Sequence, residues 1–210
     1  MVAYVPSPEA ETAGYAILSK ETVFKGFFRV DRFHLRHRLF AGGWSQEIER
    51  EIFQRGHAAG VLPYDPVLDR VVLVEQFRTA ALVAGLHPWT IEVPAGIIGK
   101  DEAPDAVARR ESVEETGCAV EALIPLYEFM PSPGGSSEVV WLFAALVDTT
   151  HSGGLAGVAH EHEDIRVVVL DYAEAIERLQ AGRIENAITI MSLQWLMMNR
   201  ERLRRERLSR

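Results

Sequence analysis

The sequence predicts an α/β protein in which a small antiparallel β domain precedes a larger mixed domain. Residues 15–55 alternate apolar and polar side chains on either side of an Ala-Gly-Gly break at 41–43, a pattern typical of short antiparallel strands. From residue 56 onward, β-rich runs are joined by one acidic helix and followed by two further helices. The length of 210 residues fits one domain of about 150 residues plus a smaller one. We therefore expect domains at 1–55 and 56–210.

Local signals predict the elements of the second domain in order. Two β-rich runs, 57–65 and 70–77, are separated by a turn that contains Pro66 and Asp69. Pro104 suits the first turn of a helix and Gly117 suits its C-terminal cap. The remaining predicted elements are strands at 89–96, 123–130, 139–147 and 165–170, and helices at 172–182 and 186–208.

Composition and charge exclude several classes of protein. Apolar residues make up 48% and charged residues 25% of the chain, as in an ordinary globular protein. The formal charge of −8 argues against a broad nucleic-acid surface. The Arg-rich C-terminus could form a nucleic-acid patch, but its Glu201 and Glu206 and the acidic whole favour a solvated helix end.

The number of cysteines and the length of the apolar runs bear on the cellular compartment of the protein. Cys118 is the only cysteine, so no intrachain disulfide can form and a reducing cytoplasm is the simplest expectation. No run of 18 apolar residues occurs, and no basic segment followed by an apolar core opens the chain. We therefore expect neither a membrane span nor a signal peptide.

The acidic helix places Glu111, Glu114 and Glu115 on one face. Residues three and four apart are neighbours on a helix, so each like-charged pair costs roughly 0.2–0.5 kcal/mol when solvated. One explanation is a solvated face relieved by Arg109 and Arg110. The other is a platform for divalent cations, because Mg²⁺ is bound through a few carboxylates together with substrate phosphates.

Residues 96–118 favour the second explanation, because they resemble the Nudix box. The pattern is a glycine, a glutamate six residues later, an Arg-Glu pair eight residues after that, then two adjacent glutamates and a glycine. Ser112 departs from the aliphatic residue or alanine that is usual at its position. The matching residues are Gly96, Glu102, Arg110, Glu111, Ser112, Glu114, Glu115, Gly117 and Cys118.

Most of the chain, about residues 20–200, is similar to the ADP-ribose pyrophosphatase branch of the Nudix hydrolases. The similarity lies in GFFRVDRFHLRHRLF, EIFQRGHAA, EQFRTAAL, PWTIEVPAG, MPSPGGSSE, HEHEDIRV and GRIENAITIMSLQWL, with Pro133 following the box by about 15 residues. The resemblance implies an α/β/α sandwich with a mixed central sheet. It also implies a homodimer in which the N-terminal domain of one subunit reaches the active site of the other.

The same resemblance implies Mg²⁺-dependent hydrolysis of ADP-ribose to AMP and ribose 5-phosphate, with Mn²⁺ as a substitute metal. Alternatives are a GDP-mannose or other nucleotide-sugar pyrophosphatase, and a non-catalytic domain that senses ADP-ribose. Glu161 is implied as the general base, and Arg110 as a salt-bridge partner that orients the glutamates. The implied metal ligands are the carbonyl of Ala95 and the carboxylates of Glu111, Glu114, Glu115 and Glu163, with Glu111 and Glu115 also catalytic. The implied substrate contacts are Phe27, Phe28, Arg50, Glu51, Arg55, Arg78, Ile97, Ser132, Pro133, Gly134 and Glu138.

Several of these residues have a structural alternative. Phe27 and Phe28 are adjacent, so in a strand they would point to opposite faces and one would be core. Arg78 follows a strand and could be solvated, and residues 131–135 could be only a turn. Glu161 and Glu163 follow a Gly-rich stretch, 152–159, that we expect to form a mobile loop between strands. They and the flanking histidines at 160 and 162 could be ordinary loop residues, and zinc ligation is disfavoured because no Cys/His spacing accompanies them.

Overall fold

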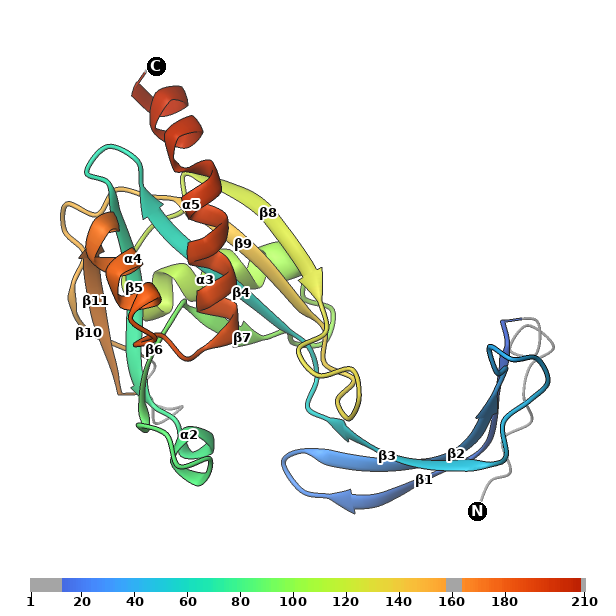
Figure 1. Ribbon diagram of the computed structural model, residues 1–210. Coiled ribbons are helices and arrows are strands. Elements are labelled where there is room, and N and C mark those ends of the chain that lie inside the picture. Colours follow the sequence, from blue (N-terminus) through green and yellow to red (C-terminus); the bar gives the residue numbers. More distant parts are fainter. Residues whose placement is uncertain (1–12, 158–163, 209–210) are drawn as a thin grey trace. The chain divides into compact units, whose positions relative to one another are not determined.

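The structure of the protein, a computed structural model, describes residues 13–157 and 164–208. It divides the chain into two compact units, and Figure 1 shows the elements of both. The first unit comprises Met1–Gly56 together with Met130–Val139, and the second comprises His57–Phe129 together with Val140–Arg210. The segment Met130–Val139 is far from the rest of the first unit along the chain, so no local sequence signal assigns it there.

The first unit is built on three antiparallel strands with β2 in the middle, which confirms the small antiparallel sheet. Asp31 on β2 is fully buried, accepts a 2.8 Å hydrogen bond from Thr22 Oγ1, and pairs with Lys20 and Arg29 at 3.2 and 3.0 Å. Burial raises the pKa of Asp31, but these contacts outweigh it and hold the pKa below its ordinary value. The strands are β1 (Tyr15–Lys25), β2 (Arg29–His37) and β3 (Ile48–Gln54).

The second unit contains a mixed sheet whose main path runs β10-β11-β5-β4-β9-β8. Strand β4 pairs with β9 in parallel and with β5 and β7 antiparallel, while β6 pairs with β5. The predicted mixed central sheet is therefore confirmed. Its strands are β4 (Ala58–Asp65), β5 (Arg70–Phe77), β6 (Trp89–Glu92), β7 (Ala95–Ile97), β8 (Ala122–Phe129), β9 (Val140–Leu146), β10 (Gly154–Ala156) and β11 (Ile165–Asp171).

Helices cover both faces of this sheet, as the sandwich requires (Figure 1). Side chains alternate along β4, so Val61 packs in one core with Val107 of α3, while Leu62 packs in another with Leu196 of α5. The α/β/α sandwich is confirmed. The helices are α3 (Pro104–Thr116), α4 (Tyr172–Gln180) and α5 (Ala187–Leu208).

Both predicted ends of α3 are confirmed. Pro104 lies in its first turn, and Gly117 ends it with φ of 72°, in the left-handed region that glycine adopts without a steric penalty. Ser112 is fully buried, and its hydroxyl donates a 2.9 Å hydrogen bond to the carbonyl oxygen of Cys118. A small polar residue is therefore accommodated at a position where the box pattern usually has an apolar one.

Three details differ from the sequence prediction. Helix α2 (Thr79–Val83) was not predicted. The predicted strand at 89–96 is two strands, β6 and β7, because Pro94 has no N–H for a sheet ladder. The expected mobile loop at 152–159 is wrong in part, because Gly154–Ala156 form β10 and pair with β11.

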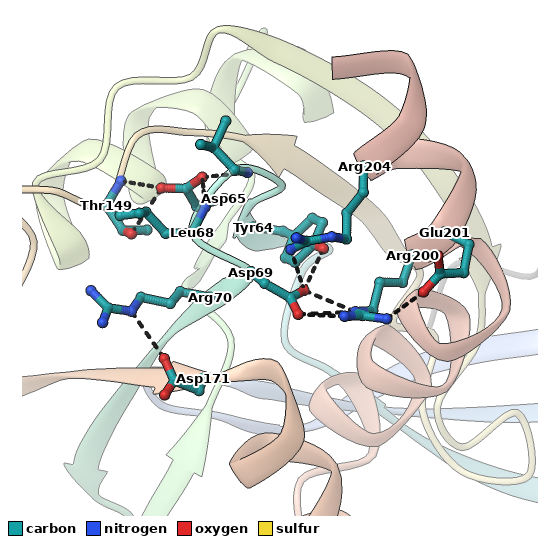
Figure 2. Close-up of polar contacts among 11 residues, drawn as sticks. Tyr64, Asp65, Leu68, Asp69, Arg70, Thr149, Asp171, Arg200, Glu201 and Arg204 are labelled. Atoms are coloured by element: carbon teal, nitrogen blue, oxygen red, sulfur yellow. Dashed lines mark hydrogen bonds and ion pairs between the residues drawn. The ribbon is translucent and has the colours of Figure 1, made fainter. Parts of the chain in front are cut away.

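The Arg-rich part of α5 is held by carboxylates. Figure 2 shows Arg200 and Arg204 extending from α5 to Asp69, in the turn between β4 and β5. Arg200 contacts both oxygens of Asp69, Arg204 lies 3.1 Å from Oδ1, and the hydroxyl of the buried Tyr64 donates to Oδ1 at 2.8 Å. Burial raises the pKa of Asp69, but the contacts with Arg200, Tyr64 and Arg204 outweigh it and lower the pKa.

Further ion pairs join Arg202 to Glu206 and Arg207 to Glu121, at 3.3 and 2.6 Å. These pairs give this end of the helix a structural role. Among residues 13–157 and 164–208, no helix combines the length and the apolar character needed to cross a membrane.

Candidate active site

Helix α3 carries the three crowded glutamates. Glu111 and Glu115 are only 8% and 3% exposed, whereas Glu114 is exposed to solvent. Burial of an ionised carboxylate is unfavourable unless positive charge or hydrogen-bond donors compensate for it. A solvated acidic face therefore fits Glu114 but not Glu111 and Glu115.

Strand β7 lies against the two buried glutamates. The backbone N–H of Ala95 donates a 3.1 Å hydrogen bond to Oε2 of Glu115. A Cβ atom placed on Gly96 would lie 1.7 Å from Oε1 and 2.4 Å from Cδ of Glu111. Only a residue without a side chain leaves room for the Glu111 carboxylate, which gives the glycine of the box its physical role.

Arg110 joins the acidic residues of the box. Its Nη1 lies 2.7 Å from Oε1 of Glu111 and 2.7 Å from Oε2 of Glu114, and its Nε donates to Oε1 of Glu102 at 3.2 Å. Partial burial lowers the pKa of Arg110, but these glutamates outweigh it and raise the pKa further above its ordinary value. The backbone N–H of Gly99 and then Arg110 lower the pKa of Glu102. One guanidinium thus offsets the repulsion among three carboxylates, as expected for a residue that orients them.

The residues around the buried Glu111 and Glu115 fit a hard divalent cation. Within the described ranges, 13–157 and 164–208, no three His, Cys, Asp or Glu side chains are grouped so as to hold a metal ion. An ion bound here would combine the buried carboxylates with backbone, water or substrate oxygens. That is the coordination Mg²⁺ prefers, since it keeps part of its hydration shell and is bound through one or two carboxylates.

Arg78 is fixed by a carboxylate that the sequence analysis missed. Its Nε and Nη2 donate to Oε1 and Oε2 of Glu92 at 3.1 and 2.8 Å. Glu92 is 6% exposed and also accepts a 2.6 Å hydrogen bond from Thr90 Oγ1. A merely solvated Arg78 does not fit this geometry. The sequence does contain a signal for Glu92: this glutamate lies between two apolar residues, in the run Ile-Glu-Val of the predicted strand.

Phe27 and Phe28 lie in the turn between β1 and β2, so the expectation that they point to opposite faces of a strand is wrong. Their rings contact each other edge to face at 4.8 Å. Phe27 is 89% exposed, while Phe28 also contacts Phe53 at 5.0 Å and lies under the guanidinium of Arg55 at 5.9 Å. The structure thus brings two predicted substrate residues, Phe28 and Arg55, together.

The segment Met130–Val139 pairs with the chain around Phe53. The backbone N–H of Phe53 donates to Gly135 O at 2.8 Å, and Ser137 N–H donates to Phe53 O at 3.2 Å. Glu138, only 9% exposed, pairs with Arg55 Nη1 at 3.4 Å. Phe28, Arg55 and Glu138, predicted from separate parts of the sequence, therefore form one group in the first unit.

The other predicted substrate residues of the first unit lie at its surface. Ser132, Pro133 and Gly134 are exposed in a turn closed by hydrogen bonds from Gly135 N–H and Ser136 N–H to Ser132 O. Arg50 donates to the backbone oxygen of Glu49 at 2.7 Å, and Glu51 pairs with Arg32 at 2.7 Å. In the second unit, Ile97 ends β7 and is 44% exposed.

Glu161 and Glu163 lie outside the described residues, as do the histidines at 160 and 162, so their proposed roles stay predictions. A separate hollow of about 420 Å³ lies next to the described end of that segment. Glu75 of β5 points to the same side of the sheet as Leu73, which packs with α4 and α5. This hollow therefore lies on the face opposite α3. It is lined by Glu75, His87, Trp89, Leu155, Asp164 and Arg166.

Comparison with known proteins agrees with this geometry. The family model described as NUDIX domain matches residues 54–189. An ADP-ribose pyrophosphatase of Escherichia coli (strain K12) is 45% identical over 190 residues, which cover 90% of this chain and 91% of that protein. An ADP-ribose pyrophosphatase of Haemophilus influenzae is 41% identical over 87% of this chain and 86% of its own. A GDP-mannose pyrophosphatase of Cronobacter sakazakii is 38% identical over 71% of this chain and 78% of its own.

Proposed function

Because the chain belongs to the NUDIX domain family, we propose that it is a hydrolase that cleaves ADP-ribose to AMP and ribose 5-phosphate with Mg²⁺. The observation that carries the proposal is the pair of buried glutamates on α3, Glu111 and Glu115, against the side-chain-free Gly96. The relatives described as ADP-ribose pyrophosphatases support this substrate, because they match about nine tenths of the chain at 41–45% identity.

The chemistry follows from the charges of the site. Glu111, Glu115 and the carbonyl of Ala95 would hold the cation, with Glu114 beside them and Glu163 as a further ligand. Bound Mg²⁺ supplies positive charge against the diphosphate and its transition state, and Mn²⁺, which takes the same oxygen ligands, is a substitute. We assign Glu161 the role of accepting a proton from the attacking water.

The substrate contacts divide by chemistry. Aromatic rings stack on bases, so Phe27 and Phe28 are assigned to the adenine, beside Arg50, Glu51 and Arg55. A guanidinium matches phosphate geometry, so Arg78 is assigned to phosphate or ribose. The rest of the ligand is assigned to Ile97, Ser132, Pro133, Gly134 and Glu138.

The first unit supports a homodimer. Of the described residues in its three strands, only Ala16 and Asp31 are buried, while apolar side chains such as Tyr15 and Phe24 are 44% and 60% exposed. A small sheet needs a buried apolar face to be stable, so we propose that a second copy covers it. Light scattering should give the mass of a dimer. Because Cys118 is the only cysteine of the chain and no intrachain disulfide can form, we also propose a reducing compartment, the cytoplasm.

A nucleotide-sugar panel tests the activity. The pure protein is incubated with ADP-ribose, GDP-mannose and related compounds, with and without Mg²⁺, and products are separated by chromatography. We expect AMP from ADP-ribose, loss of activity with chelator and recovery with Mg²⁺. Faster hydrolysis of GDP-mannose would favour the second candidate, which the 38% identical relative supports. Tight binding of ADP-ribose without AMP release over hours would indicate a sensing domain.

A further inference from the structure

Glu92 is a buried carboxylate at the end of β6 that receives three hydrogen bonds. Arg78 contributes two of them through the parallel pair Nε–Oε1 and Nη2–Oε2, and Thr90 contributes the third from its hydroxyl. Parallel N–H···O bonds of this kind fix the plane of a guanidinium as well as its position. Glu92 therefore determines how Arg78 is oriented.

The backbone also holds Arg78 in place. It lies directly after β5, and its N–H donates a 2.7 Å hydrogen bond to Pro88 O, which closes the segment that carries α2. The side chain is 42% exposed although it makes a bidentate contact. Since the contact uses Nε and Nη2, the edge of the guanidinium that carries Nη1 is turned away from Glu92. Arg78 is therefore held in one orientation while part of its side chain stays accessible to solvent.

Glu92 lies on the same face of the sheet as the box glutamates. It pairs with Val74 of β5, two residues after Val72, which packs in one core with Val107 of α3. Strand β6 continues through Val93 and Pro94 to Ala95, whose N–H holds Glu115. One short stretch of chain, 90–96, therefore fixes both Arg78 and the buried glutamates.

We propose that Glu92 is a positioning residue for ADP-ribose hydrolysis, which holds the guanidinium of Arg78 in the orientation that contacts the anionic diphosphate or its attached ribose. The inference rests on the proposed function. A charged arginine side chain loses considerable rotamer freedom when it binds a ligand, and an existing bidentate contact removes that loss in advance. Thr90 fixes the Glu92 carboxylate in turn, so the three side chains form one chain of hydrogen bonds.

The test is a double-mutant cycle on steady-state kinetics with ADP-ribose and Mg²⁺. Glu92→Gln keeps the volume of the side chain but replaces one acceptor oxygen by a donor. The pair of parallel hydrogen bonds from Arg78 is therefore lost. We expect KM to rise by about 10- to 100-fold with a smaller change in kcat, the size expected for charge-assisted hydrogen bonds. In an Arg78→Ala background, Glu92→Gln should change KM by less than about twofold, because the residue to be positioned is gone.

Glu75→Gln is the matched control. Glu75 pairs with Arg166 across neighbouring strands on the opposite face of the same sheet, so its loss should leave KM and kcat unchanged. Thr90→Val provides a second, milder variant if Glu92→Gln does not fold. We expect its KM to rise by about three- to tenfold. This rise should likewise be absent in the Arg78→Ala background.

The outcomes separate this inference from the function on which it rests. Absence of AMP release by the unsubstituted protein contradicts the proposed function. If the unsubstituted protein is active, independent effects of the two substitutions overturn the positioning role. In that case the change in KM of the double variant equals the product of the changes in KM of Glu92→Gln and Arg78→Ala. The positioning role is overturned equally if the melting temperature falls while KM stays at its original value, because Glu92 would then serve stability alone.

Discussion

Gly96→Ala tests the close approach between β7 and the Glu111 carboxylate. The added Cβ would stand 1.7 Å from Oε1 and 2.9 Å from Cγ of Glu111, whereas ordinary van der Waals contact begins at 3.4 Å. The carboxylate oxygen must therefore retreat by about 1.7 Å, or β7 must shift away from α3. Because Glu111 is a side chain with rotatable bonds, we expect the side chain to move rather than the strand.

The predicted loss is larger for activity than for stability. A misplacement of about 1 Å in a catalytic arrangement can reduce the rate by about 10²-fold, so we expect kcat to fall by about 100-fold or more. Overpacking typically costs about 1–3 kcal/mol of stability. For a chain of this size, that corresponds to a decrease in melting temperature of roughly 2–4 °C for each kcal/mol.

The assay is AMP release at saturating ADP-ribose and Mg²⁺, with melting curves measured in parallel. Gly135→Ala is the control, because a Cβ at that position meets no atom within 4 Å and needs no positive φ. Its kcat should stay within about twofold of the original value, since the added methyl group would meet open space. An unchanged kcat in Gly96→Ala would refute the argument that the bare glycine holds the Glu111 carboxylate in place.

Three further predictions follow from the charges. Glu115→Gln should keep the fold and lower kcat by orders of magnitude; unchanged turnover at saturating Mg²⁺ would remove Glu115 from the ligands. Glu161→Gln should lower kcat by about 10²- to 10⁴-fold without recovery at higher Mg²⁺, whereas extra Mg²⁺ should restore much of the activity of Glu163→Gln; near-normal turnover of Glu161→Gln would place the base elsewhere. Asp69 has a folded pKa below 3.8, so its contribution to stability is present above pH 3.8 and is lost as the pH falls through that lower value. Asp69→Asn should therefore lower the melting temperature at pH 7 and match the original protein in strong acid, and an equal deficit at both pH values would contradict the linkage.

Local signals predicted most of the elements and the ends of α3. Pro104 and Gly117 act through their own backbone geometry, so their effect does not depend on distant residues. The mixed sheet needed the family resemblance, because the parallel pairing of β4 with β9 joins segments far apart in sequence. Phe27 and Phe28 were misplaced because a turn of a few residues ends β1 sooner than the alternating pattern indicated.

The site was predicted only as far as the motif extends. The box spacing identified Glu111, Glu114 and Glu115, but composition could not indicate that two of them are buried and one exposed. Glu92 was missed because its partner, Arg78, directly follows the neighbouring strand β5, and which residues of two strands meet depends on their register. The contact between Arg55 and Glu138 was missed for the same reason, since it depends on where Met130–Val139 returns to the first unit.

That return of Met130–Val139 also sets an order of events during synthesis. Strand β3 leaves the ribosome before the segment whose Gly135 and Ser137 complete the hydrogen bonds of Phe53. At roughly 5–20 residues per second, the nascent first unit waits several seconds with that strand edge uncovered, a state prone to pairing with other chains. Cutting the chain once, after Gly56, would make this state permanent. A fragment intended to represent the first unit therefore has to include residues 130–139, joined through a linker or added as a peptide.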